Sequence, residues 1–193
     1  MERLSIVLTN YILKKEVITK DDYEIYLYGF QSFLELFLNL VCSLCIAFFI
    51  HMEVECLLFF LLFIPLRSFN GGLHLKSYFS CLVFSCATMT VILLIVKYYS
   101  LNAPVSFLLY LVFMVLIKIT GAVDHPNRPV DTDENQTFTH KTDRTLFISF
   151  LAALCFLFLN LENYIFLEAL IYLLVFITLI LSKISGRKKQ QME

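Results

Sequence analysis

Residues 26–50 read YLYGFQSFLELFLNLVCSLCIAFFI, an apolar run in which Glu35 is the one charged side chain. The hydrocarbon core of a bilayer is about 30 Å thick, and a helix needs roughly 20 apolar residues to cross it. This run is therefore long enough to span a membrane. The rest of the chain has the same character, because 59% of its 193 residues are hydrophobic, 16% are charged and the mean hydropathy is +0.78. These values predict an integral membrane protein and not a soluble globular domain.

Polar residues divide the chain into six apolar runs, each a candidate for one membrane crossing. The runs are residues 26–50, 54–66, 78–96, 104–121, 146–161 and 164–182. The second is short and contains Pro65, so we expect it to continue into the polar residues after it or to tilt into the protein. The sequence therefore predicts an all-α, polytopic membrane protein of about six transmembrane helices, with residues 1–193 forming one domain.

The first 20 residues differ from the six runs because their apolar side chains alternate with polar ones at helical spacing. The apolar positions are Leu4, Val7, Leu8, Tyr11 and Ile12. This pattern predicts an amphipathic helix in residues 1–20 that lies on the membrane surface. The segment lacks the uninterrupted apolar core and the cleavage site of a signal peptide, so we expect the chain to insert through its own spans.

Lysine and arginine residues gather at alternate connections between the runs. They precede the first run and follow the second, fourth and sixth, whereas Lys97 lies on the other side. By the positive-inside rule, both termini, residues 67–77 and a loop at residues 122–145 face the cytoplasm. We therefore expect a multi-pass protein of the cell membrane, with the lipid bilayer as a partner. The formal net charge of −1 argues against a nucleic-acid partner.

The polar segment after the second run, residues 67–81, reads RSFNGGLHLKSYFSC and contains both a histidine and a cysteine. An imidazole within about 3–4 Å of a thiol can generate the nucleophilic thiolate. On one straight helix, His74 and Cys81 would lie roughly 10 Å apart along the axis. Asn70-Gly71-Gly72 predicts a turn, which lets His74 fold back over a helix that starts near Tyr78. We predict a catalytic dyad here; the alternative is a histidine and a cysteine that merely lie at the membrane surface.

The other cysteines lie in or beside the apolar runs, where we expect small, buried, apolar side chains. Cys42 and Cys45 form a CxxC motif, so a membrane thiol–disulfide oxidoreductase is one alternative function. Glu35 and Glu168 lie inside runs, and intramembrane carboxylates usually face a bundle interior or a polar cavity. A noncatalytic transporter that uses these two carboxylates is a second alternative. The histidines are too far apart for a metal site that we would trust, so we expect no metal and no cofactor.

With this polar segment the sequence resembles the accessory gene regulator B (AgrB) family, membrane cysteine endopeptidases that process quorum-sensing propeptides. The matching block is Arg67-x4-Gly72-x-His74-x6-Cys81-x3-Ser85, and Gln31 in YGFQ matches an upstream position. The hydropathy pattern agrees along nearly the whole chain, including the amphipathic start.

The resemblance implies that His74 is the general base and Cys81 the nucleophile of a thiol protease whose active site faces the cytoplasm. It also implies supporting or substrate-binding roles for Gln31, Arg67, Gly72 and Ser85. Gly72 either supplies a backbone conformation with positive φ or acts directly. Arg67 either anchors the chain at the inner surface or binds a carboxylate. A main-chain carbonyl or Gln31 orients the base, or no third group does.

The resemblance further implies the substrate, an AgrD-like precursor peptide. The enzyme would remove the C-terminal tail through a thioacyl-enzyme, and a side chain of the precursor would capture the acyl group as a cyclic thiolactone or lactone. The family also suggests a homodimer. Residues 122–145 carry several acidic side chains where relatives are often basic, so the sequence does not predict how the charged tail is recognised.

Overall fold

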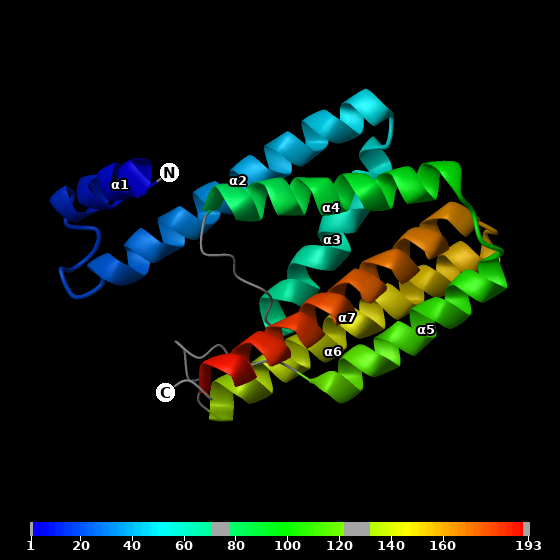
Figure 1. Cartoon of the computed structure of the whole chain (residues 1–193). Helices are drawn as coiled ribbons and strands as arrows, with labels where there is room; N and C mark the ends of the chain where they lie inside the picture. The colour runs from blue at the N-terminus through cyan, green and yellow to red at the C-terminus, as the bar shows by residue number, and fades with distance from the viewer. Residues whose placement is uncertain (1, 71–77, 122–131, 191–193) are drawn as a thin grey trace.

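The computed structural model describes residues 2–70, 78–121 and 132–190, which form seven helices and no strands (Figure 1). The helices are α1 (Glu2–Lys14), α2 (Tyr23–Ile50), α3 (Glu53–Asn70), α4 (Tyr78–Tyr98), α5 (Ala103–Thr120), α6 (Thr132–Phe158) and α7 (Glu162–Gln190). The predicted all-α class is confirmed. His74 and Gly72 lie outside the described residues.

Helix α1 occupies most of the predicted amphipathic segment and packs against the start of α2, away from the other helices (Figure 1). Its small polar side chains, Ser5 and Thr9, are buried. The larger apolar side chains of Leu4, Val7 and Tyr11 are exposed. An exposed apolar face of this kind suits a helix that rests on lipid.

Four helices among the described residues are long and apolar enough to cross a membrane. They lie at residues 23–50, 79–98, 103–120 and 162–184. Helix α3 contains Glu53, Glu55 and Arg67 among its 18 residues, and α6 is charged over its first half, which lowers the hydropathy of both. The fifth and sixth crossings therefore stay predictions.

Helix α6 begins at Thr132, well before the apolar run that starts at Leu146. The second half of segment 122–145, which we predicted as a loop, is therefore helical. Backbone hydrogen bonding does not depend on apolar side chains, so a helix can continue into polar sequence. The last proline of this segment is Pro129, and the helix starts soon after it.

Two sharp turns join neighbouring helices with very few residues. At the end of α2, His51 adopts the left-handed conformation (φ 54°, ψ 53°), and the Met52 amide donates to the Ala47 carbonyl at 3.0 Å. Asn160 has φ 53° at the turn from α6 to α7, where the Leu161 amide donates to the Phe156 carbonyl at 2.9 Å. Both turns have the bonding of a Schellman motif, which ends a helix and reverses the chain.

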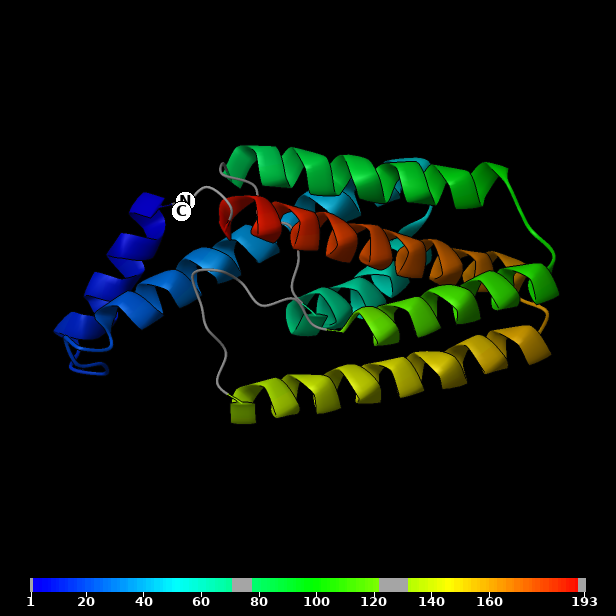
Figure 2. The same ribbon diagram turned by 60° about the horizontal axis from the view of Figure 1, so that its bottom comes forward.

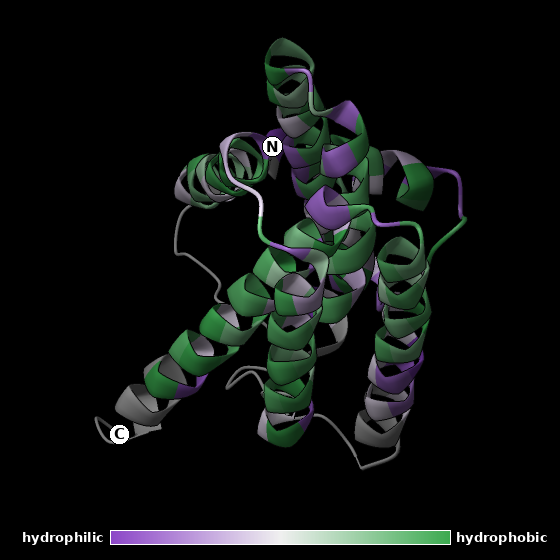
Figure 3. Ribbon diagram, turned by 90° about the vertical axis from the view of Figure 1, so that its right-hand side faces the viewer, coloured by the Kyte–Doolittle hydropathy of each residue, from purple (hydrophilic) through white to green (hydrophobic). Residues whose placement is uncertain are grey.

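The buried core is formed mainly by α3, α4 and α7, with further residues from α2, α5 and α6, and α5 packs closely along α7 (Figure 2). Many large apolar side chains lie outside this core and are exposed, and apolar residues cover most of the length of the helices (Figure 3). Examples are Phe33, Phe49, Leu61, Phe79 and Ile119. Such a surface would promote aggregation in water, whereas in a bilayer it is the face that contacts lipid tails.

Candidate functional site

Cys81 lies in the first turn of α4, which begins at Tyr78 as the sequence predicted. Its side chain is a free thiol and is half-buried. His74, its predicted partner, lies outside the described residues, so the dyad stays a prediction. Gly72 lies outside them too.

Helices α2 and α4 run parallel, because their contacts join residues at a nearly constant separation in sequence. The Asn39 amide donates to the Ser85 hydroxyl at 2.8 Å, across 46 residues. Farther along both helices, the Lys97 ammonium donates to the Ile50 carbonyl at 2.6 Å, across 47 residues. These two contacts fix the register of α4 on α2.

Asn39 is the centre of a small polar cluster between the two helices. Besides its bond to Ser85, it accepts hydrogen bonds through Oδ1 from Ser43 Oγ at 3.3 Å and from Cys86 Sγ at 3.6 Å. The Ser43 hydroxyl and the Cys86 thiol are themselves 3.7 Å apart. Because polar groups have no water partners in hydrocarbon, such bonds hold transmembrane helices together. Ser85, predicted to support the site, therefore anchors α4 one turn after Cys81.

Gln31 lies on the same face of α2 as this cluster, two turns earlier. Its side-chain amide donates to Oε1 of Glu35 at 3.3 Å, and both side chains are half-buried. Residues four apart share one face of a helix, so Gln31, Glu35, Asn39 and Ser43 form a polar stripe. Neither Ser43 nor Cys86 was predicted as a site residue. The four-residue spacing of polar side chains within the apolar run was the signal that could have identified Ser43.

Arg67 lies in the last turn of α3, and its side chain is half-buried. The guanidinium carbon is 5.7 Å from the ring centroid of Phe63, one turn earlier on the same helix. At this distance a cation–π interaction stabilises the side chain along the helix surface. Neither predicted role of Arg67, as an anchor or as a carboxylate ligand, is tested by this contact.

A second polar cluster joins α5, α6 and α7. Ser149 Oγ donates to Oε1 of Glu168 at 3.2 Å, and the hydroxyls of Tyr110 and Ser149 are 3.3 Å apart. The rings of Tyr110 and Tyr172 meet edge to face, with centroids 4.8 Å apart. Glu168 is fully buried, which confirms that it faces the bundle interior. Within the described part of the chain, neither its Oε2 atom nor the Tyr172 hydroxyl has a hydrogen-bond partner.

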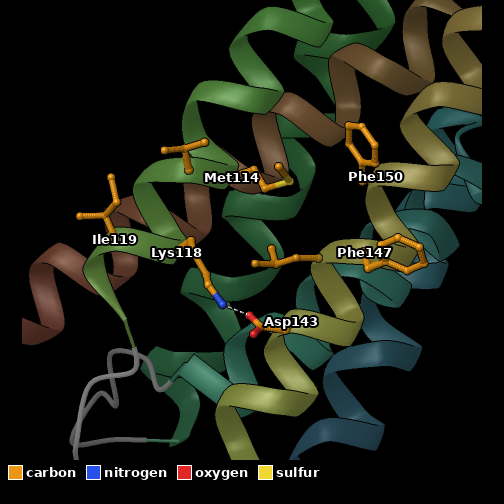
Figure 4. A pocket seen from close by; sticks show the side chains of 8 residues that line it. Met114, Lys118, Ile119, Asp143, Phe147 and Phe150 are labelled. Carbon is orange, nitrogen blue, oxygen red and sulfur yellow. Dashed lines mark hydrogen bonds and ion pairs between the residues drawn. The ribbon is translucent and has the colours of Figure 1, made fainter.

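A pocket of about 400 Å³ lies between α5 and α6, and it contains none of the predicted site residues (Figure 4). Its walls are apolar apart from the ion pair of Lys118 and Asp143. The lining residues are Met114, Val115, Lys118, Ile119, Asp143, Leu146, Phe147 and Phe150. The pocket therefore belongs to a different part of the molecule from Cys81.

The six cysteines are free thiols. Cys56 is buried, as predicted, but Cys45 and Cys155 are exposed, so the prediction of burial is wrong for these two. The reason is that the outer face of a membrane helix is also apolar, and a thiol is compatible with either side. Cys42 and Cys45 are not joined in a disulfide, and the described residues contain no group of three metal-ligating side chains.

Comparison with known proteins identifies a family. No curated protein and no solved structure matches the chain. The family described as accessory gene regulator B matches residues 5–182, from the first turns of α1 to the last third of α7. This match covers most of the chain, including the polar stripe of α2, the end of α3 and the start of α4. The chain therefore belongs to the accessory gene regulator B family.

Proposed function

We propose that this protein is a membrane cysteine endopeptidase that removes the C-terminal tail of an AgrD-like precursor. The observation that carries this proposal is the family match over residues 5–182, because the family is associated with the processing of agr quorum-sensing propeptides. The position of Cys81 in the first turn of α4 supports it further. A nucleophile at the end of a membrane helix is accessible to a peptide that lies on the membrane surface.

The reaction begins when His74 accepts the proton of the Cys81 thiol. The thiolate attacks the carbonyl carbon of the scissile peptide bond, the carbon–nitrogen bond breaks, and His74 returns the proton to the departing amine. The tail leaves, and the precursor remains bound to Cys81 as a thioester. A thiol or hydroxyl of the precursor then attacks this thioester, which closes the ring and releases the Cys81 thiol. Exchange of one thioester for another conserves the activated acyl group, which hydrolysis would lose.

The supporting residues act on the position of this nucleophile. The hydrogen bond from Asn39 to Ser85 fixes the first turns of α4 against α2, and Arg67 lies in the last turn of α3, at the start of the polar segment. In this proposal Gly72 supplies backbone freedom for the turn that precedes the base. Arg67 attracts the acidic tail of the precursor.

We also propose that α3 and α6 supply the fifth and sixth crossings, with both termini and the active site at the cytoplasmic surface. The distribution of lysine and arginine supports this topology. In this arrangement α1 lies on the inner leaflet, where it can meet a precursor bound to the same surface. The functional unit is a homodimer by analogy with the family.

Co-expression with a candidate precursor, encoded beside the gene, tests the function. We expect mass spectrometry to detect the truncated peptide with the unmodified enzyme and not with Cys81→Ser or His74→Ala. Cys155→Ser is the matched control, because this thiol is exposed on α6 and lies outside the proposed site. Normal amounts of truncated peptide from Cys81→Ser would refute the proposal.

A further inference from the structure

We propose that the buried polar cluster between α5, α6 and α7 binds one sodium ion. The cluster consists of Tyr110 on α5, Ser149 on α6, and Glu168 and Tyr172 on α7. The three helices lie side by side (Figures 1 and 2). The peptidase mechanism uses none of these four side chains, so the inference goes beyond the proposed function and does not depend on it.

Glu168 places a carboxyl group where no basic side chain of the described residues pairs with it. It is fully buried in α7, within the candidate membrane span at residues 162–184. Its hydrogen-bond donor in the described part of the chain is the neutral hydroxyl of Ser149. An ionised carboxylate without a counter-charge is very costly in a membrane interior. Glu168 therefore needs a positive charge, which is either a proton or a metal cation.

Two polar atoms of the cluster have bonding capacity that the described residues do not use. Glu168 Oε2 and the Tyr172 hydroxyl have no hydrogen-bond partner among those residues, and both side chains are fully buried. Residues four apart share one face of a helix, and the Tyr172 hydroxyl interacts electrostatically with Tyr110 and Glu168. Buried polar atoms nearly always have a partner in native proteins. A cation held between these oxygen atoms would supply it.

The spacing of the other oxygen atoms favours a cation of the size of sodium. Ser149 Oγ lies 3.2 Å from Glu168 Oε1 and 3.3 Å from the Tyr110 hydroxyl, whereas an O–H···O bond usually measures about 2.7–2.8 Å. Calcium, whose ionic radius is close to that of sodium, has oxygen ligands at about 2.3–2.6 Å, so ligands at right angles lie about 3.3–3.7 Å apart. The shorter bonds of magnesium give about 2.9 Å. The observed distances are close to the lower end of the first range.

The charge of the cluster selects a monovalent ion. Carboxylate and hydroxyl oxygens are hard ligands, which suit ions such as sodium and calcium. Glu168 supplies one negative charge, and the three hydroxyl groups are neutral. Sodium would neutralise this charge, whereas calcium would leave a net positive charge buried among apolar side chains. The sequence prediction of no metal considered histidine ligands, and hydroxyl groups on three separate helices have no local spacing that could reveal them.

The cluster lies close to one end of the bundle. Glu168 is about two turns after Glu162, the first residue of α7, and Tyr110 is about two turns after Ala103, the first residue of α5. Two turns correspond to about 10 Å along a helix. In the proposed topology these ends face outward, and Glu162 is exposed there. Its negative charge would attract cations to the surface nearest the site.

The test measures how sodium changes the thermal stability of the full-length protein in detergent. Unfolding is followed by circular dichroism in sodium chloride and in choline chloride at the same ionic strength. A ligand that binds only the folded protein raises the midpoint of unfolding as its concentration rises. We expect sodium to raise the midpoint by several degrees relative to choline, and the larger potassium ion to raise it less. Equal midpoints in sodium and choline would overturn the proposal.

Substitutions assign the response to the cluster. Glu168→Gln removes the charge and should abolish the response to sodium. Tyr172→Phe keeps the ring and removes one ligand, so about tenfold more sodium should be needed for the same shift. Glu35→Gln is the matched control, because it removes a carboxyl group of α2 outside the cluster and should retain the response. An undiminished response in both cluster variants, or its loss in Glu35→Gln, would place the ion elsewhere and refute the site.

Binding of radioactive sodium distinguishes a cation at Glu168 from a proton. We expect the unmodified protein to retain sodium, and Glu168→Gln to retain none. A protein that retains no sodium and unfolds at the same temperature as Glu168→Gln in every salt would have a protonated carboxyl group, which contradicts the proposal. If Glu168→Gln does not fold, the weaker binding expected of Tyr172→Phe decides in its place. These measurements do not involve peptide processing, so their outcome is independent of whether Cys81 cleaves a precursor.

Discussion

The side-chain amide of Asn39 donates a 2.8 Å hydrogen bond to the hydroxyl of Ser85, which lies one helical turn after Cys81. Through this bond α2 determines the place of the first turns of α4. We expect Asn39→Ala to lower the stability of the protein by about 1 kcal/mol and to reduce peptide processing several-fold, because interhelical hydrogen bonds in membranes contribute about 0.5–2 kcal/mol. Processing can be followed by mass spectrometry and stability by unfolding in sodium dodecyl sulfate.

Thr88→Ala is the control for this substitution. The Thr88 hydroxyl donates to the Phe84 carbonyl of its own helix at 2.7 Å, so its removal breaks no bond between helices. Equal losses from Asn39→Ala and Thr88→Ala would contradict a special role for the Asn39–Ser85 bond.

Ser149→Ala should destabilise the bundle of α5, α6 and α7. It removes the donor to Oε1 of Glu168, a fully buried carboxyl, and an unpaired buried polar group costs about 1–3 kcal/mol. The midpoint of unfolding in sodium dodecyl sulfate measures this loss. Thr90→Ala, which removes a bond to the Cys86 carbonyl within α4, should have a smaller effect, and the reverse order would argue against the importance of the cluster.

The ion pair between Lys118 and Asp143 should contribute little to stability. The two side chains are 53% and 43% exposed, and partly exposed ion pairs contribute at most about 1 kcal/mol. We expect a double-mutant cycle of Lys118→Met and Asp143→Asn to give a coupling energy within this limit. A coupling of several kcal/mol would mean that the pair is shielded from water in the bilayer.

The proposed topology predicts which positions react from each side of the membrane. In a variant without native cysteines, Tyr99→Cys should react with a membrane-impermeant maleimide added to intact cells, because Tyr99 is exposed and lies on the outward connection of α4 and α5. His140→Cys, on the exposed surface of α6, should react only after permeabilisation. Labelling of both positions from outside would contradict the proposed topology.

The positions of the helices could largely be predicted from the sequence because polar residues mark where the hydrocarbon ends. Tyr78 begins α4 as expected, and Ile50 ends α2. The predictions were poorer for α6 and α7, which extend into polar sequence beyond the runs at 146–161 and 164–182, whereas the extension of α3 into the polar residues after it was expected. Hydropathy describes the solvent around a helix, whereas the end of a helix depends on backbone hydrogen bonds.

The candidate site was predictable only where its residues lie close in sequence. The short separation of His74 and Cys81 led to Cys81, which is in the predicted helical turn, and the family resemblance implied Ser85. The contact of Asn39 with Ser85 joins positions 46 residues apart, and a local pattern does not specify which helices pair or in which direction. Asn39 is a polar residue in an apolar run, but only the fold shows its partner.

The parallel direction of α2 and α4 has a consequence for how the protein is made. In the proposed topology, a chain that crosses the membrane through α2 returns through α3 before α4 can lie alongside α2 in the same direction. During synthesis, the hydrogen bond from the Asn39 amide to Ser85 therefore cannot form until α4 has emerged from the ribosome. Because each residue of a helix turns the chain by about 100°, an insertion or deletion in α3 would also change the direction in which the chain leaves that helix. Correct assembly of the site therefore constrains the length of α3, although the middle of α3 contributes no described group to that site.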